Sequence, residues 1–309
     1  MVDLSAPRAT ATRERLRARF GADVAAWWAK LPSVLRGLAH DWELELGEPV
    51  GSGNTSLVVR CRRAGRAHEP AILKLTPDPA IASAEATALR VWAPTGRVPA
   101  VYAAGTGALL LEAITPETPL AEQAEPAPLT EVAALIQALH PPGFADEAAA
   151  GGIGSAAART DELFALWTRR AAGDTQLAAA LARGRALAAE LAGDPPRLVL
   201  AHGDLHPGNV LTPGRAPEHP QRRLVAIDPR PSLADPASDA IDWVVLGVPA
   251  RWRAAAEELA ASLDVDPDRL WAWCRAFAAR LAATEAATER RQAFRDMAVY
   301  GTPGLPPPP

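Results

Sequence analysis

Hydrophobic and polar positions follow two different periods along the first quarter of the chain. Residues 8–30 carry apolar side chains at helical spacing, which predicts an amphipathic helix that ends near Pro32 and a short helix over 33–40. From Trp42 the period changes to that of strands. Residues 44–75 alternate apolar and polar positions around glycine-rich turns, and this pattern predicts antiparallel strands.

Helical spacing returns after a Pro- and Glu-rich run and continues almost to the end of the chain. The Ala- and Gly-rich segment 145–158 has few side chains to pack, and we predict a loop there. A sheet followed by many helices is typical of the α+β class. The periodicity predicts helices over 129–140, 160–172, 175–191 and 268–283.

The 309 residues are long enough for two lobes, each with a core of its own. Changes of pattern and composition separate the lobes and the chain ends. The Pro-rich end is expected to be disordered. We predict N-terminal helices in 1–40, a sheet lobe in 41–114, a linker in 115–128, a helical lobe in 129–303 and a disordered tail in 304–309.

Charge and composition exclude several classes of partner. A net charge of -4 provides no basic field for a polyanion, so we expect no nucleic-acid partner. Cys61 and Cys274 are too few for a disulfide framework or a metal cluster, which fits a reducing compartment. We find no signal peptide and no apolar run of roughly 18 residues. A cytoplasmic protein without a membrane partner is therefore expected, and no pattern indicates an oligomeric state.

Three side chains with oxygen acceptors follow short apolar runs in the second half of the chain. Asp204 and Asn209 lie in the loop 202–209, and Asp228 ends the run 224–227. Phosphoryl transfer needs a carboxylate that deprotonates the attacking hydroxyl, and amide and carboxylate oxygens that hold Mg²⁺ against phosphates. The short step from Asp204 to Asn209 allows one loop to supply both. The alternative is a polar turn that these two residues merely cap.

Lys74 lies inside an apolar strand and therefore requires an explanation. Lys30 and Lys74 are the only lysines among the 32 basic Lys and Arg residues, so the chain otherwise uses arginine. A buried lysine is costly unless it is paired. Glu85, on a helix predicted over 80–92, is the natural partner, and Lys74 would then bind the α- and β-phosphates of a nucleotide. The alternative is an exposed lysine on an edge strand.

A glycine-rich hairpin precedes the Lys74 strand. Glycines allow the backbone to approach an anion closely, and small hydroxyl side chains add donors. Any tight turn can have this composition, but the position before the lysine strand favours a phosphate-covering loop. The candidate residues are Gly51, Ser52, Gly53, Asn54, Thr55 and Ser56.

The order of these motifs resembles that of the aminoglycoside phosphotransferase family, in its streptomycin 6-kinase/hydroxyurea phosphotransferase branch. The resemblance covers roughly residues 25–300. At Arg230 the branch is expected to have a lysine, a mild change in an arginine-rich chain. The motifs are GSGNTSLV, LKLTP, LLLE, HGDLHPGN, AIDPRP and DPxxD, in this order.

The resemblance implies a two-lobed, protein-kinase-like fold with ATP between the lobes. It makes Asp204 the catalytic base, and Asn209 and Asp228 the Mg²⁺ ligands. Asp239 is expected to brace the catalytic loop through His202, which is expected to anchor the loop and not to carry protons.

The resemblance also implies a hinge that binds adenine through the backbone. It places this contact at Leu111, Glu112 and Ala113, although Glu112 could equally be an ordinary strand-end carboxylate.

The implied reaction is phosphorylation of a hydroxyl on a small molecule, most simply the 6-hydroxyl of an aminoglycoside such as streptomycin, which inactivates the antibiotic. A sugar, another metabolite or a hydroxyurea-like acceptor would use the same core. A nucleotide-binding protein without catalysis is the alternative from a different class.

Overall fold

The computed structural model divides the chain into two compact units, Met1–Glu117 and Thr118–Pro309. The division falls within the segment 115–128. The predicted tail at 304–309 lies outside the described residues. These are residues 2–50, 54–66, 68–115, 118–171, 173–212 and 224–301.

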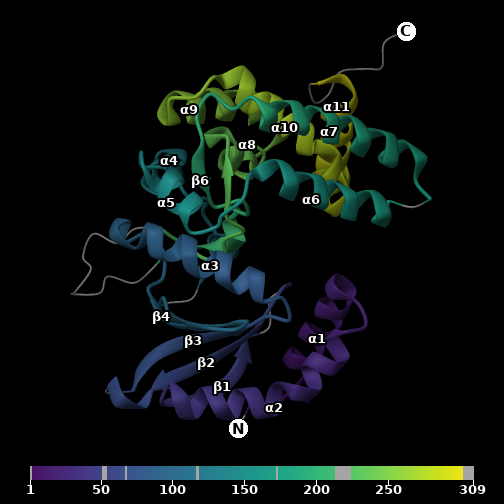
Figure 1. Cartoon of the computed structure of the whole chain (residues 1–309). Helices are drawn as coiled ribbons and strands as arrows, with labels where there is room; N and C mark the ends of the chain where they lie inside the picture. The colour runs from purple at the N-terminus through teal and green to yellow at the C-terminus, as the bar shows by residue number, and fades with distance from the viewer. Residues whose placement is uncertain are drawn as a thin grey trace. The chain divides into compact units, whose positions relative to one another are not determined.

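A five-stranded antiparallel sheet forms the centre of the first unit (Figure 1). β3 pairs with β2 on one side and with β5 on the other. Lys74 therefore does not lie on an edge strand. The order is β1-β2-β3-β5-β4, with bounds Leu44–Val50 for β1, Leu57–Arg63 for β2, Glu69–Leu75 for β3, Val101–Gly105 for β4 and Ala108–Glu112 for β5.

Different helices cover the two faces of this sheet. α1 (Pro7–Phe20) and α2 (Val24–Asp41) pack against a core that includes Leu73 and Leu75 of β3. α3 (Pro79–Trp92) packs on the opposite face, so that Figure 1 shows α3 above the sheet and α2 below it. Because successive strand side chains point to opposite faces, the residue between Leu73 and Leu75 faces α3.

The predicted boundary between the first two helices is wrong. α1 ends before Gly21, whose φ of +82° lies in the left-handed region that glycine tolerates. α2 continues through Pro32, although proline removes one helical N–H donor. Leu31 and Leu35, on either side of Pro32, are buried in the core under the sheet. This packing stabilises the helix across the proline.

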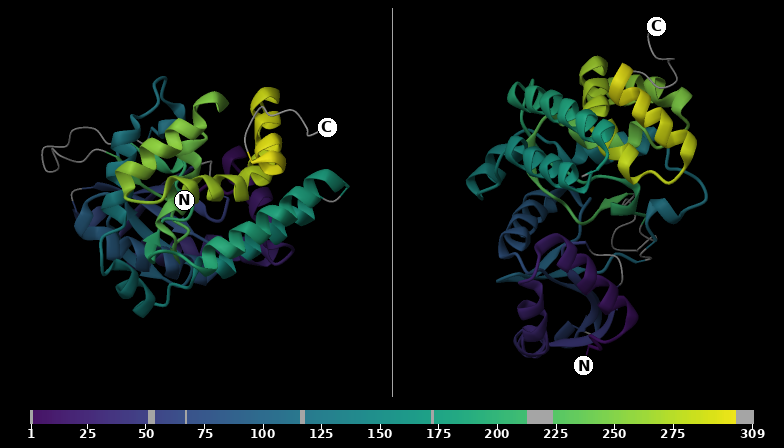
Figure 2. Two further views of the ribbon diagram at one scale, coloured as in Figure 1. Left: turned by 90° about the horizontal axis from the view of Figure 1, so that it is seen from above. Right: turned by 90° about the vertical axis from the view of Figure 1, so that its right-hand side faces the viewer.

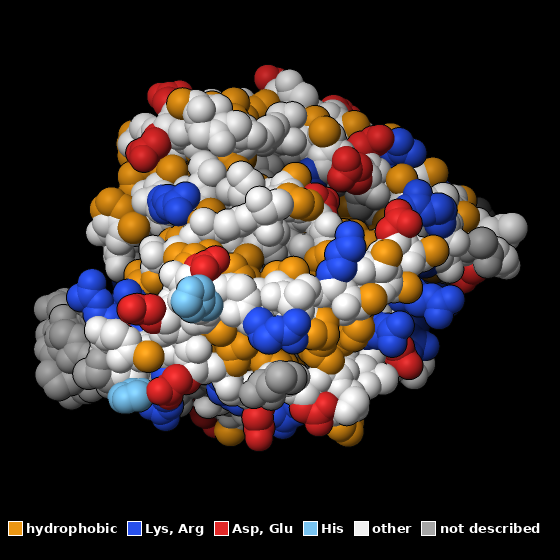
Figure 3. Space-filling model, turned by 60° about the horizontal axis from the view of Figure 1, so that its bottom comes forward, with side chains coloured by type: hydrophobic (Ala, Val, Ile, Leu, Met, Phe, Trp, Pro, Cys, Tyr) orange, Lys and Arg blue, Asp and Glu red, His pale blue; other side chains and the backbone are white. Residues whose placement is uncertain are grey.

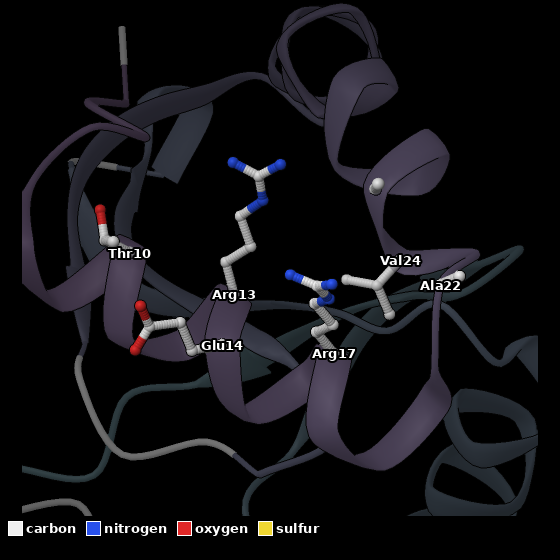
Figure 4. A pocket seen from close by; sticks show the side chains of 7 residues that line it. Thr10, Arg13, Glu14, Arg17, Ala22 and Val24 are labelled. Atoms are coloured by element: carbon white, nitrogen blue, oxygen red, sulfur yellow. The ribbon is translucent and has the colours of Figure 1, made fainter.

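A surface pocket of about 490 Å³ lies between α1 and α2 (Figure 4). In this view the Arg13 and Arg17 side chains extend from α1 into the space between the helices. Arg13 also lies above the ring of Trp28, 6.0 Å from its centroid. The pocket is lined by Thr10, Arg13, Glu14, Arg17, Ala22, Val24 and Ala25, none of them a predicted site residue.

Helices make up most of the second unit. α6 and α7 lie side by side, and α10 packs against α7 and α11 (Figures 1 and 2). A Cβ at Gly184 of α7 would lie 2.3 Å from the Ala276 carbonyl oxygen of α10, so this contact requires glycine. The helices are α4 Leu129–Leu139, α5 Phe144–Ala150, α6 Ala156–Arg170, α7 Thr175–Gly193, α8 Ile241–Val244, α9 Trp252–Leu263, α10 Pro267–Thr284 and α11 Thr288–Tyr300.

The prediction of a loop over 145–158 is wrong. α5 occupies the first part of this segment, and α6 begins at Ala156. Ala148 of α5 is fully buried although its side chain is small. The other predicted helices, over 129–140, 160–172, 175–191 and 268–283, correspond to α4, α6, α7 and α10.

Two short antiparallel ladders carry the motif-bearing loops of the second unit. β6 (Val199–Ala201) pairs with β9 (Ser232–Ala234), and β7 (Val210–Leu211) pairs with β8 (Val225–Ala226). All the residues of β6, β7 and β8 are buried. The loop 202–209 therefore begins and ends on strands anchored in the core.

The described helices and surface bear on the predictions about membranes and charge. No helix in the part of the chain that the structure describes is both long and apolar enough to cross a membrane. Acidic and basic side chains are interspersed on the face seen in Figure 3. This face therefore carries both signs of charge, in keeping with the small net charge of -4.

Candidate active site

The first unit contains a buried ion pair between β3 and α3. Lys74 Nζ lies 2.5 Å from Glu85 Oε1, and the two side chains are 9% and 4% exposed. The strand alternation turns Lys74 away from the core that contains Leu73 and Leu75, and toward α3. The structure thus brings together the two residues that the sequence paired.

The start of α3 determines where Glu85 lies. The Asp78 carboxylate accepts a hydrogen bond of 3.0 Å from a backbone N–H of the first turn, and Pro79 occupies the first helical position. Glu85 then lies on the same buried face of the helix as Leu89, one turn later. A carboxylate buried there is tolerated because the Lys74 ammonium group pairs with it.

The hairpin between β1 and β2 is described only in part. Gly51, Ser52 and Gly53 lie outside the described residues. Asn54 is exposed, whereas Thr55 and Ser56 are buried. Ser56 Oγ has no hydrogen-bond partner among the residues that the structure describes. A buried hydroxyl without a partner is costly, and a bound anionic oxygen would satisfy it.

The predicted hinge residues lie at the end of β5. Leu111 and Glu112 belong to the strand, and Ala113 follows it. The Glu112 N–H donates to the Ala100 carbonyl oxygen at 2.9 Å, and Glu112 Oε2 accepts from the Ala100 N–H at 3.0 Å. The Glu112 side chain therefore acts as a strand-end carboxylate. The backbone contact with adenine stays a prediction. Of the three predicted residues, Ala113 is the most suitable for it, because it lies outside the strand.

The second unit brings Asp204, Asn209 and Asp228 together at one end of the β7–β8 ladder. Asn209 Nδ2 donates to the Asp204 carbonyl oxygen at 2.9 Å and lies 3.4 Å from Asp204 Oδ2. The Asn209 carbonyl oxygen accepts from the Ile227 N–H at 2.9 Å, and Asp228 is the next residue. The residues predicted as the base and as the Mg²⁺ ligands thus lie on two loops that are hydrogen-bonded to each other.

Asp228 has a strained backbone. Its φ of +58° lies in the left-handed region, which costs a residue other than glycine on the order of 1 kcal/mol or more. The flanking contacts impose this conformation. His202 Nε2 lies 3.0 Å from the Ile227 carbonyl oxygen, and the Arg230 N–H donates to the His202 carbonyl oxygen at 2.7 Å. Strain maintained by such contacts is typical of functional sites.

A buried carboxylate holds the start of the loop 202–209. Asp239 accepts from the backbone N–H groups of His202 and Gly203 at 2.7 and 2.8 Å, and its other contact is His140 Nε2 at 3.0 Å. Burial alone would raise the pKa of the Asp239 carboxyl, but the hydrogen bonds from His140 and Gly203 outweigh it and lower that pKa. The prediction that Asp239 braces this loop through His202 is confirmed.

His202 is an anchor of the loop. Burial lowers the pKa of its imidazole despite the nearby carboxylates of Asp239 and Asp204, so the ring is neutral. Because a carbonyl oxygen only accepts, the contact with Ile227 requires the proton on Nε2. The ring is fully buried. It therefore holds the loop, as predicted, and does not carry protons.

The donor set suits Mg²⁺. Among the described residues, the hydrogen bonds of the Asn209 side chain use Nδ2, which leaves the side-chain oxygen Oδ1 for a cation. Asp228 adds a carboxylate. No group of three or more His, Cys, Asp or Glu side chains that could hold a metal occurs in the described ranges. Mg²⁺ usually binds through one or two protein ligands together with phosphate and water oxygens, and this pair fits that pattern.

Contacts of Arg159 and His140 with the supports of the loop 202–209 were not predicted. Arg159 of α6 donates to the carbonyl oxygens of Gly203 and Arg230, and His140 at the end of α4 meets Asp239. Neither belongs to a motif. The partners are separated by 44 or more positions in the sequence. The one local signal is that His140 stands at a predicted helix end before two prolines.

Comparison with known proteins identifies the family. Residues 41–288 match the aminoglycoside/hydroxyurea antibiotic resistance kinase family. The chain belongs to this family. It is 32% identical over 226 residues to the streptomycin 6-kinase of Streptomyces griseus, across 71% of this chain and 68% of that protein. It is 33% identical over 259 residues to the hydroxyurea phosphotransferase of Kitasatospora aureofaciens, across 79% and 69%.

A solved structure supports the same conclusion about the fold. APH(2")-IIia, in its GDP and kanamycin complex, has a TM-score of 0.56 at 13% identity, across 87% of this chain and 96% of that chain. At this identity the likeness concerns the fold alone, and it confirms the predicted protein-kinase-like fold. Membership of the family confirms the predicted enzyme class, a phosphotransferase. α1 and nearly all of α2 precede the matched residues.

Proposed function

We propose that this protein transfers the γ-phosphate of ATP to a hydroxyl group of an aminoglycoside, with the 6-hydroxyl of streptomycin as the leading candidate. The observation that carries the proposal is the hydrogen-bonded arrangement of Asp204, Asn209 and Asp228. The likeness to a streptomycin 6-kinase supports the choice of acceptor.

Asp204 is the proposed catalytic base. Its carboxylate accepts the proton of the acceptor hydroxyl as the oxygen attacks the γ-phosphate. The Asn209 amide group, which is bonded to the Asp204 backbone and lies near its carboxylate, orients it. Asp239 holds the peptide groups immediately before it. A base positioned in this way contributes about 10²–10⁴-fold to the rate.

Asn209 and Asp228 are the proposed Mg²⁺ ligands. When bound, the ion neutralises charge on the phosphate oxygens and helps to hold them in line. Asn209 would hold the ion through its side-chain oxygen Oδ1, while Nδ2 remains bonded to Asp204. One side chain thereby couples the base to the metal ligands, and the strained Asp228 backbone is maintained for the same purpose.

The first unit supplies the proposed nucleotide phosphate contacts. Lys74, held by Glu85, presents a compact positive charge for the α- and β-phosphates. The buried hydroxyl of Ser56 is a donor to a phosphate oxygen, and Thr55 lies beside it. The GDP bound in the structural relative supports a nucleotide as the phosphate donor.

A second candidate acceptor is hydroxyurea or a related small hydroxyl compound. The likeness to a hydroxyurea phosphotransferase is as extensive as that to the streptomycin enzyme, and it favours this candidate specifically. The same base, metal ligands and lysine would serve either acceptor.

The test is acceptor-dependent ADP release with Mg-ATP, using streptomycin, other aminoglycosides, hydroxyurea and simple sugars. We expect release with streptomycin, and a rate lowered about 10²–10⁴-fold in Asp204→Asn. Release with hydroxyurea alone would favour the second candidate. Full activity of Asp204→Asn would contradict the assigned base. Nucleotide binding without turnover on any acceptor would contradict the proposed reaction and favour a protein that binds nucleotide without catalysis.

A further inference from the structure

One arginine bridges the two loops that carry the proposed base and the proposed metal ligand. Arg159 Nη2 donates to the Gly203 carbonyl oxygen at 3.2 Å, and Nη1 donates to the Arg230 carbonyl oxygen. Gly203 immediately precedes Asp204, and Arg230 follows Asp228 by two positions. We propose that Arg159 is a positioning residue, which fixes the Asp204 loop against the Asp228 loop.

The two loops are in direct backbone contact where Arg159 binds them. A Cβ at Gly203, whose φ is +73°, would lie 2.2 Å from the Arg230 carbonyl oxygen. The Arg230 N–H also donates to the His202 carbonyl oxygen at 2.7 Å. The two carbonyl groups that Arg159 binds therefore lie on loops that are in direct contact, and one guanidinium group satisfies both.

A guanidinium group suits this task better than an ammonium group. Its planar fork directs N–H groups from two nitrogens to two acceptors at once, whereas lysine supplies one point charge on a flexible stem. Arg159 uses Nη1 for one loop and Nη2 for the other. The distance between the two loops is thereby coupled to the dimensions of a rigid group.

The start of α6 places Arg159 at this position. The Leu233 N–H of β9 donates to the Gly154 carbonyl oxygen at 2.9 Å, and Ser155 forms a bridge with Leu233. α6 begins at the next residue, so Arg159 lies in its first turns. Because β9 pairs with β6, the strand that enters the catalytic loop, the arginine and its targets share one support.

Arg159 and Asp239 bind opposite kinds of backbone group in neighbouring peptides. Asp239 accepts from the backbone N–H groups of His202 and Gly203, and Arg159 donates to the Gly203 carbonyl oxygen. Charged side chains thus satisfy both the backbone N–H groups and the backbone carbonyl group of the residues just before Asp204. Loss of Arg159 removes the donor to the Gly203 carbonyl oxygen, whereas the contacts of Asp239 involve other atoms.

The inference rests on the proposed function, and its test compares three variants. Arg159→Ala removes both bonds, and Arg159→Lys retains one positive charge. Arg185→Ala is the matched control, because Arg185 of α7 pairs with Asp161 of α6 at 2.7 Å and contacts neither loop in the bonds described. The control weakens the support of α6 without touching the loop carbonyls.

We expect Arg159→Ala to lower kcat about 10–100-fold, and to raise the Mg²⁺ concentration for half-maximal activity, as losses in supporting contacts of a metal site do. Arg159→Lys should retain an intermediate kcat. Added guanidinium ion should restore part of kcat to Arg159→Ala, but not to Asp204→Asn. Arg185→Ala should keep the wild-type kcat and Mg²⁺ requirement.

A second readout does not depend on turnover. Amide hydrogen exchange in peptides covering residues 199–209 and 225–234 should be faster in Arg159→Ala than in the wild type or Arg185→Ala. If no acceptor is phosphorylated by the wild type, the proposed function fails, and exchange alone decides the role of Arg159. Wild-type exchange in Arg159→Ala, or an equal loss of activity or protection in Arg185→Ala, would overturn the inference.

Discussion

Removing Glu85 should separate the structural contribution of the Lys74 ion pair from its catalytic contribution. Glu85→Ala deprives the Lys74 ammonium of the carboxylate at 2.5 Å, although the lysine side chain is only 9% exposed. Breaking a buried pair by removing one partner costs about 3–5 kcal/mol. An unfolding entropy of about 2.1 cal/mol/K per residue gives about 1.5 °C for each kcal/mol in a chain of 309 residues, so the unfolding midpoint should fall by roughly 5–8 °C.

The double variant Lys74→Met/Glu85→Leu provides the matched comparison. Replacing a buried ion pair by apolar side chains of similar volume is often neutral or stabilising. The unfolding midpoint should therefore return close to that of the wild type. The double variant should nevertheless have no turnover, because it has no Lys74 ammonium group on β3 to bind the nucleotide phosphates.

Both quantities can be measured on the same preparations. Thermal unfolding followed by far-UV circular dichroism gives the midpoint, without nucleotide, since bound ligand would stabilise the fold. Acceptor-dependent ADP release gives the turnover. A Glu85→Ala protein that unfolds at the wild-type temperature would refute the energetic reasoning. Wild-type turnover in the double variant would refute the assignment of Lys74 to the phosphates.

Three further predictions concern the second unit. Arg269→Ala removes the cation bonded to the fully buried Asp235 carboxylate, and it should lower the free energy of unfolding by about 3–5 kcal/mol in a urea titration. An unchanged transition would contradict this. Gly203→Ala forces a Cβ against the Arg230 carbonyl oxygen at a positive φ, so turnover should fall roughly 10²-fold in steady-state kinetics. Burial lowers the pKa of His202, so its contribution to stability is present above about pH 6.5 and is lost as the pH falls below that value. The unfolding midpoint should decline between pH 7 and pH 5, and less steeply in His202→Gln; equal slopes would exclude His202 as the cause.

The sequence by itself determined the parts of this protein that depend on local chemistry. Alternation along β3 places Lys74 opposite Leu73 and Leu75, whatever lies on either face. The order of Asp204 and Asn209 within one short loop likewise follows from the chain alone. The predicted face of Lys74 is confirmed because neighbouring residues on a strand have few alternative arrangements.

Only the tertiary structure decided the elements in which packing overrides local preference. α2 passes through Pro32 because its apolar side chains are buried against the sheet. The segment 145–158, with little to bury on its own, contains α5 because Ala148 fits into a core supplied by other elements. Propensity and periodicity describe one segment at a time, and they do not include the surface on which it packs.

The supports of the candidate site also come from the tertiary structure alone. Arg159 binds backbone carbonyl groups beside the candidate site, and His140 binds the Asp239 carboxylate that holds the loop 202–209; both come from helices distant in sequence. A carbonyl group is present in every residue, so no side-chain pattern indicates which one an arginine will bind. The sequence therefore determined which residues carry the proposed chemistry, and the fold decided what holds Asp204 and Asp228 in place.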